Sequence, residues 1–211
     1  MTKRAVIKGV GHYLPKRIVP NSEFEKTLNT SDDWIITRSG IKQRHFSNEN
    51  ETTSKMAILA GKQAIKEAKI EASDLDAIIL ATSTADLTFP SAATMVQAGL
   101  GMKHGFAYDV QAVCAGFIYA ISIGVAMLKD THGKKCLVIG ADSMSKILDW
   151  NDRSTAVLFG DGAGAVILEN RTVRNDCIEN GQWGILTSKI FTDGQHYDLL
   201  STDGGVSKTK S

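Results

Sequence analysis

Cys114 is the side chain of this sequence best placed for covalent chemistry. The surrounding run, residues 108–117, predicts an extended strand that turns sharply into an apolar helix, with Cys114 at the turn. The first turn of a helix presents unpaired N–H groups and a partial positive charge, which stabilise a thiolate and can hold the oxyanion of a tetrahedral intermediate. The segment favours a buried, apolar-flanked nucleophile that attacks a thioester. Simple core packing of Cys114 fits the spacing equally well.

The other two cysteines have no comparable setting. Cys136 lies inside an apolar strand segment, which indicates a packing role, and Cys177 lies in a polar stretch typical of an incidental surface thiol. Three widely separated cysteines predict neither a disulfide framework nor a zinc site. We therefore expect no metal, and a reducing compartment, most simply the cytoplasm.

Charge and hydropathy narrow the class of partner. The 211 residues carry 24 basic and 23 acidic side chains, which gives a net charge of +1. This balance gives no support for binding to nucleic acid or to a membrane surface. No apolar run approaches the ~20 residues that a membrane span needs, and residues 1–11 lack the apolar core of a signal peptide. We expect a soluble protein.

Strand and helix patterns alternate along the chain and would position the cysteine. Strands are predicted over residues 5–11, 77–81, 106–110, 136–140, 155–159, 163–168 and 184–191, with a turn at 160–162. Helices are predicted over residues 22–28, 31–38, 91–100 and 114–129, and from a cap at Thr53 or Ser54 to about Lys69. The last of these has a stripe of alanines at 57, 60, 64 and 68 that allows close packing. This order indicates an α/β fold with a mainly parallel sheet covered by helices on both faces.

Several motifs resemble those of the β-ketoacyl-acyl carrier protein synthase III family. Residues 109–117, around Cys114, resemble its nucleophile segment, and further similar segments follow the family's order over nearly the whole chain: 30–41, 89–93, 151–155 and 159–165. The resemblance implies a thiolase-like fold of two similar layered α/β halves, usually a homodimer. Residues 1–170 would be the amino-terminal half that carries the nucleophile. Residues 171–211 would begin the second half or connect to it.

The resemblance also implies a two-step reaction without a cofactor. Cys114 would take the acyl group of a short acyl-CoA, most simply acetyl-CoA, which is a substrate. Malonyl-acyl carrier protein would then lose carbon dioxide and attack the Cys114 thioester, which initiates fatty-acid synthesis. The family completes this site with a histidine and an asparagine from its second half. None of His12, His45, His104, His132 and His196 matches that position, so we expect the chain to be a fragment rather than a natural truncation or one part of a two-chain site.

Substrate-binding roles are implied for five residues near the expected CoA site. Trp34 and Arg153 match positions that clamp the CoA adenine between a ring face and a guanidinium, a geometry favourable for stacking. Arg38 matches a phosphate contact, and Thr30 and Ser39 flank the same site. Taken without the resemblance, Trp34 fits a half-buried packing residue and Arg38 a solvated charge.

Two phenylalanines are implied to border the acyl pocket. Phe159 matches a wall near the nucleophile. Phe89 matches a position that reaches across a dimer to the partner's pocket, although ordinary core packing fits it comparably well. Gly160, Gly162 and Gly164 are expected to permit a tight turn and close strand packing.

Other functions remain open at this point. A different thiolase-fold condensing enzyme, of the hydroxymethylglutaryl-CoA or polyketide-starter synthase type, would use the same acyl-cysteine. A truncated, non-catalytic CoA-binding module would bind CoA without forming a covalent acyl-enzyme. A cysteine hydrolase is disfavoured because no cysteine-protease signature surrounds Cys114.

Overall fold

A five-stranded sheet lies at the centre of the computed structural model, which describes residues 2–129, 133–173 and 184–208. Its spatial order is β1-β7-β6-β4-β5. The bounds are β1 Thr2–Tyr13, β4 Ala77–Ala81, β5 Phe106–Val110, β6 Lys135–Ser143 and β7 Asp161–Val173. The predicted strands at 5–11, 77–81, 106–110, 136–140 and 163–168 are therefore confirmed, and β4 and β5 have the predicted ends.

Strand directions make the sheet mainly parallel. β4 pairs in parallel with both β5 and β6, whereas β7 runs antiparallel to its neighbours β6 and β1. Four strands of the described sheet therefore share one direction and β7 opposes them. All five residues of β4 are buried, as expected for a central strand covered on both faces.

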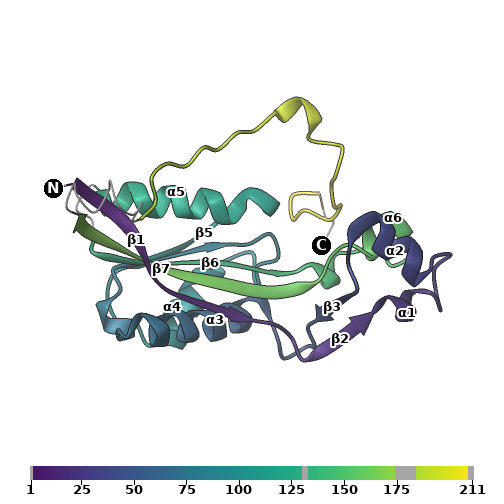
Figure 1. Ribbon diagram of the computed structural model, residues 1–211, viewed down its shortest axis with the longest axis horizontal. Coiled ribbons are helices and arrows are strands. Elements are labelled where there is room, and N and C mark those ends of the chain that lie inside the picture. Colours follow the sequence, from purple (N-terminus) through teal and green to yellow (C-terminus); the bar gives the residue numbers. More distant parts are fainter. Residues whose placement is uncertain (1, 130–132, 174–183, 209–211) are drawn as a thin grey trace.

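Helices cover both faces of this sheet, as predicted (Figure 1). α3 (Thr53–Ala68) and α4 (Ala92–Leu100) pack on one face, and α5 (Gly116–Lys129) packs on the other. Among the described residues, no helix combines the length and apolarity needed to cross a bilayer.

The alanine stripe of α3 brings this helix unusually close to β1. The four alanines are at most 1% exposed. A Cβ added to Gly9 of β1 would lie 2.5 Å from the carbonyl oxygen of Ala64, and one on Gly11 would collide with that of Ala60. The predicted close packing is confirmed, and it depends on small residues of both elements.

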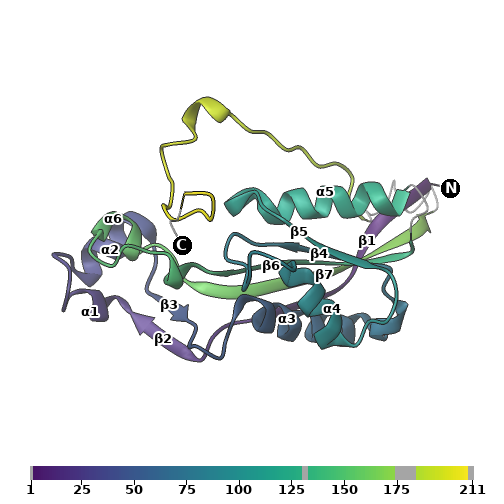
Figure 2. The ribbon, with the colours of Figure 1, turned by 180° about the vertical axis from the view of Figure 1, so that it is seen from behind.

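A second, smaller layer lies at one end of the sheet (Figure 2). It consists of a two-stranded sheet, β2 (Arg17–Pro20) and β3 (Gln43–Phe46), with the helices α1 (Asn21–Phe24), α2 (Asp32–Ser39) and α6 (Arg153–Ala156). Its buried apolar residues are Val19, Phe24, Ile35, Phe46, Ala156 and Val157. Short 3-10 turns complete the described chain: η1 Ala72–Asp74, η2 Val113–Ala115, η3 Met144–Lys146 and η4 Gly194–His196.

The prediction for the cap of α3 is wrong. Thr52 occupies the N-cap, and its side chain makes no capping hydrogen bond to the helix backbone. Thr53 Oγ1 instead donates to the carbonyl oxygen of Thr84, and Ser54 Oγ donates to Asp86. These hydroxyls hold the loop after β4, because tertiary partners compete with local capping. The predicted helix at 22–28 is also shorter, since α1 ends at Phe24.

Two predicted strands near the end of the chain are wrong. Residues 155–159 do not form a strand, because the helix α6 covers the start of this segment instead. The Asp152 carboxylate caps this helix by accepting hydrogen bonds from Ser154 N, Ser154 Oγ and Thr155 Oγ1. Asp161 and Gly162 belong to β7, so the turn predicted at 160–162 is absent too. The segment from 184 to 191 has no strand and makes one backbone bond to the sheet, from Ile185 N to Ala5 O.

Candidate active site

Cys114 lies where the parallel strands end and α5 begins. β5 ends at Val110, whose carbonyl oxygen accepts from Thr82 N just beyond β4. Cys114 follows in the 3-10 turn η2, two residues before the start of α5 at Gly116. The helix predicted from Cys114 therefore begins slightly later. A Cβ on Gly116 would lie 3.2 Å from Cβ of Ala81, so this glycine lets the helix start close to the sheet.

The turn around Cys114 is strained. Val113 has φ of 45°, in a region that a β-branched residue rarely adopts. Ala112 before it has φ of −150° and ψ of 30°, and its carbonyl oxygen accepts from Ala115 N at 3.0 Å. Such strain persists only where the surrounding structure imposes it, and here it lies in the residue directly before Cys114.

Cys114 is exposed, which corrects the expectation of a buried thiol and excludes core packing. It borders a cavity of about 540 Å³. The lining is apolar on several sides, with Val113, Met144, Ile147, Leu148, Phe159 and Leu200. A thiol at the wall of a partly apolar cavity can meet an acyl chain and hold its carbonyl within reach of backbone N–H groups.

The described lining contains no histidine. His45 Nδ1 is engaged 2.6 Å from the carbonyl oxygen of Pro15, and His132 lies outside the described residues, as does Cys177. Within residues 2–129, 133–173 and 184–208, no group of three or more His, Cys, Asp or Glu side chains is arranged to hold a metal ion. The chemistry offered by the described residues is therefore that of a single nucleophile in an acyl-sized cavity.

Two guanidinium groups contact the ring of Trp34 in the small layer. Its helix α2 is capped by Ser31, whose Oγ accepts from Trp34 N at 3.1 Å. Arg38, one turn later, has its guanidinium carbon 4.4 Å from the indole centroid. Arg153 of α6 approaches to 4.5 Å and donates to the carbonyl oxygen of Asn29 at 2.7 Å. The structure thus brings together three of the predicted binding residues, two from α2 and one from α6.

Arg153 rests directly on the indole in this arrangement. An adenine between the two planes would need them about 7 Å apart, twice the ~3.5 Å contact distance. The Arg153 side chain is exposed and is held by a hydrogen bond to Asn29 O, so a base can enter only if this side chain changes its rotamer.

The two predicted hydroxyls near this cluster differ in their bonding. Ser39 Oγ donates to Ile35 O at 2.6 Å and accepts from Ile41 N at 3.1 Å, so it ties the end of α2 to the following chain. Thr30 Oγ1 is buried and has no partner among the described residues. A buried hydroxyl without a partner is unfavourable by about 1–3 kcal/mol, and a bound ligand atom would remove that penalty.

The two predicted phenylalanines are separated by the structure. Phe159 precedes β7 and lines the Cys114 cavity. Phe89 is 83% exposed, which excludes core packing, and it is absent from the described lining of that cavity. Its loop is anchored at Asp86, which accepts from Ser54 N and Oγ.

Sequence reasoning missed the polar residues that support the cavity. Asp142 at the end of β6 accepts from Ser83 N at 2.8 Å, and Ser83 lines the cavity. Burial raises the pKa of Asp142, while the bonds from Ser83, Thr82 and Thr84 oppose the shift. Its place at the carboxyl end of a buried parallel strand is a signal that could have identified it. Leu200 and its neighbours also reach the cavity, and no periodic pattern marked them.

The chain is similar in sequence to known proteins. A profile of the family described as 3-oxoacyl-[acyl-carrier-protein (ACP)] synthase III matches residues 108–194. A β-ketoacyl-[acyl-carrier-protein] synthase III of Roseobacter denitrificans is 61% identical over 207 residues, which cover 98% of this chain and 63% of the relative. The chain thus spans less than two thirds of that relative's length.

Solved structures show the same similarity. A 3-oxoacyl-(acyl carrier protein) synthase III from Pseudomonas aeruginosa superposes with a TM-score of 0.87 at 35% identity, over 96% of this chain and 61% of that one. The corresponding protein of Aquifex aeolicus gives 0.78 at 49% identity, over 81% of this chain and 55% of that one. Both are thiolase-like α/β folds, so the predicted fold class is confirmed.

Proposed function

We infer that this chain belongs to the β-ketoacyl-[acyl-carrier-protein] synthase III family, because it is similar to such proteins over almost its whole length. We therefore propose that the protein containing it condenses a short acyl-CoA with malonyl-acyl carrier protein. The observation that carries the proposal is Cys114, exposed on a strained turn at the wall of an acyl-sized cavity. This reaction initiates fatty-acid synthesis, and acetyl-CoA is the proposed acyl donor.

In the first step the Cys114 thiolate attacks the carbonyl carbon of the acyl-CoA. The tetrahedral intermediate collapses with loss of the CoA thiolate, which leaves the acyl group on sulfur. In this proposal, backbone N–H groups of the turn that carries Cys114 stabilise the oxyanion. In the second step malonyl-acyl carrier protein loses carbon dioxide, and the electron pair of the broken bond forms an enolate. The enolate attacks the acyl carbonyl, expels the Cys114 thiolate and gives β-ketoacyl-acyl carrier protein.

The cluster of Trp34, Arg38 and Arg153 is the proposed CoA site. Arg153 moves off the indole, the adenine stacks between them, and Arg38 meets a phosphate. Support comes from the 4.4 and 4.5 Å approaches of the two guanidinium groups to the Trp34 ring. Thr30 Oγ1, buried and unpartnered, is available to the same ligand, and Ser39 keeps the end of α2 in place.

Phe159 and Phe89 are proposed to border the acyl pocket from two subunits of a homodimer. β5 is an edge strand of the described sheet, and Phe106 on it is 41% exposed. Phe89 protrudes with 83% of its surface exposed and is therefore accessible to a partner subunit. We further propose that residues 1–170 form the amino-terminal half, that 171–211 lead into the second, and that the enzyme acts in the cytoplasm without a cofactor.

The test is the intact mass of the full-length protein after incubation with acetyl-CoA. We expect the mass to increase by one acetyl group, with no increase in Cys114→Ala and an unchanged increase in the control Cys136→Ala. Acylation that survives Cys114→Ala would contradict the proposal. Turnover on malonyl-acyl carrier protein is expected to exceed that on acetoacetyl-CoA, and the reverse preference would instead indicate a hydroxymethylglutaryl-CoA type of synthase.

A further inference from the structure

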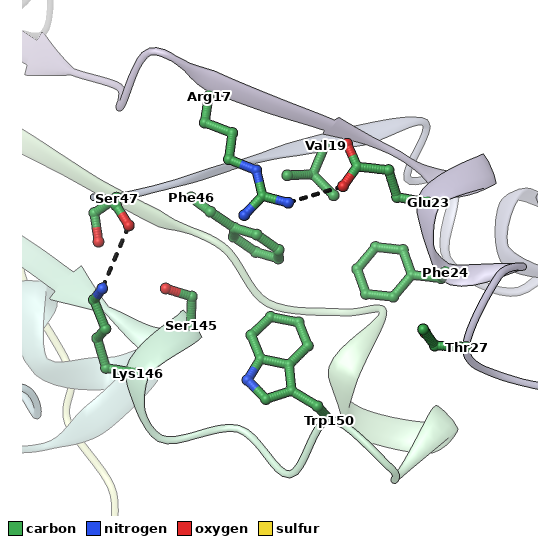
Figure 3. A pocket seen from close by; sticks show the side chains of 10 residues that line it. All are labelled: Arg17, Val19, Glu23, Phe24, Thr27, Phe46, Ser47, Ser145, Lys146 and Trp150. Carbon is green, nitrogen blue, oxygen red and sulfur yellow. Dashed lines mark hydrogen bonds and ion pairs between the residues drawn. The ribbon is translucent and has the colours of Figure 1, made fainter. Parts of the chain in front are cut away.

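A second cavity lies in the small layer, away from Cys114. Figure 3 shows this pocket, which has a volume of about 370 Å³ and is built from β2, α1, β3 and the segment around η3. Ser145, Lys146 and Trp150 form one of its walls. We call it the aromatic pocket, because Phe24, Phe46 and Trp150 all line it. Its size is within the usual range for small-molecule sites.

The three rings form a platform for a flat ligand. Phe24 and Trp150 are nearly parallel, with 19° between their planes and 6.5 Å between their centroids. Phe46 stands edge-on to both. The Phe24 and Phe46 side chains are buried, whereas Trp150 is 43% exposed and so has indole surface available. Aromatic faces at this spacing favour stacking of another planar ring.

The charges around the pocket sum to one positive charge. Arg17 pairs with Glu23 at 2.8 Å. Lys146 Nζ has no acidic partner among the described residues and lies 3.4 Å from the carbonyl oxygen of Ser47. These three groups line the pocket, and Figure 3 shows the ammonium group at its edge.

Two buried groups of opposite charge, Arg44 and Asp161, are outside this lining. Arg44 is 6% exposed, lies 4.6 Å from the Phe24 ring centroid and donates only to neutral groups among the described residues. The Asp161 carboxylate is saturated by hydrogen bonds from Ser47 and Ser145. Among the residues that line the pocket, Lys146 is the cation without an acidic partner, which suits a ligand with a single negative charge.

The aromatic pocket and the Cys114 cavity share a wall but not a lining residue. Met144, Ile147, Leu148 and Asp149 face the cysteine, whereas Ser145, Lys146 and Trp150 face the aromatic pocket. The same segment thus separates the two cavities, and both can be occupied at once.

We propose that the aromatic pocket binds a planar aromatic monocarboxylate. Its ring stacks on the exposed indole of Trp150 beside Phe24 and Phe46, and its carboxylate pairs with the ammonium group of Lys146. The site is independent of the acyl-CoA chemistry proposed above, because it uses none of those residues.

The test is isothermal titration of the full-length protein with 2-naphthoate, and with 2-naphthamide as its neutral analogue. We expect one saturable site for the carboxylate and at least about fivefold weaker binding of the amide. Lys146→Gln should weaken binding of the carboxylate about tenfold without affecting the amide, and Trp150→Ala should weaken both. Lys62→Gln, an exposed lysine of α3 outside the pocket, is the matched control and should change nothing.

Three results would overturn the proposal: no saturable binding, equal affinity for the amide, or unchanged affinity in Lys146→Gln. Alkylation of Cys114 by iodoacetamide locates the ligand independently. Because the segment from 144 to 149 separates the cavities, saturating 2-naphthoate should leave Cys114 reactive. Protection of Cys114 would place the ligand in the cysteine cavity and would also refute the assignment. Lys146→Gln keeps the test decisive even if Trp150→Ala does not fold.

Discussion

Cys136 lies within the central sheet and Cys114 lies just beyond the end of one of its strands. The two thiols differ in solvent exposure, which governs thiol reactivity. Cys136 lies near the start of β6, 1% exposed, between Ala77 of β4 and Leu168 of β7. Its burial raises the pKa of the thiol to about 12, with a smaller contribution from Asp76. Cys114 lies beyond the end of β5, exposed beside a cavity. The interior of the sheet suppresses thiol chemistry, and the carboxyl ends of its strands permit it.

Alkylation should separate the two thiols most strongly. In a Cys177→Ser background of the full-length protein, we expect iodoacetamide at pH 8 to label Cys114 at least about 10³-fold faster than Cys136. With a pKa of about 12, only about one Cys136 thiol in 10⁴ is ionised at that pH, and the group must also become exposed before it reacts. Peptide mass spectrometry over time measures both rates, and comparable rates would refute the comparison.

The pH dependence of stability tests the buried thiol alone. The folded state keeps Cys136 neutral, whereas the unfolded chain ionises it near the ordinary pKa of 9.0. The stabilising effect is therefore complete below pH 9 and is lost as the pH rises toward 12. Between pH 8 and pH 10 we expect the free energy of unfolding of wild type to fall by about 1.4 kcal/mol more than that of Cys136→Ala. Parallel urea titrations of both proteins measure this, and equal slopes would contradict the pKa shift.

The sequence predicted the elements whose signal is continuous and local. The apolar run 77–81 became β4 without a change of bounds, because a buried parallel strand needs an unbroken apolar segment. The segment 106–110 also became β5 with the predicted bounds, although it is a partly exposed edge strand that contains Asp109. The strand predicted over 155–159 failed because the carboxylate of Asp152 caps a helix there, which outweighs the apolar pattern. The cap at Thr53 failed because a loop 31 residues away takes its hydroxyl.

The candidate site was predictable only in part, because some of its features are local in the sequence and others depend on tertiary contacts. Cys114 was identified from its strand-to-helix turn, and the approach of Arg38 to Trp34 follows from helical spacing. Nothing local indicates that Arg153 lies on Trp34, that Leu200 reaches the cysteine cavity, or that Val113 adopts a positive φ. These features depend on how distant segments pack, and single-sequence patterns do not encode such contacts.

Glycine substitutions at the strained residue and at the residue before it test the turn, and their expected effect is the smallest. Val113 at φ of 45° carries strain that glycine would relieve, whereas Ala112 at −150° carries none of that kind. Ala112→Gly should lower the free energy of unfolding by about 0.5–1 kcal/mol through chain entropy. Val113→Gly should leave it unchanged or raise it by up to about 1 kcal/mol, because strain relief of about 1–2 kcal/mol offsets that entropy. Urea denaturation of the two full-length variants measures the difference. Equal destabilisation would mean that the turn stores no strain, and the contrast between the two cysteines would then depend on exposure and burial alone.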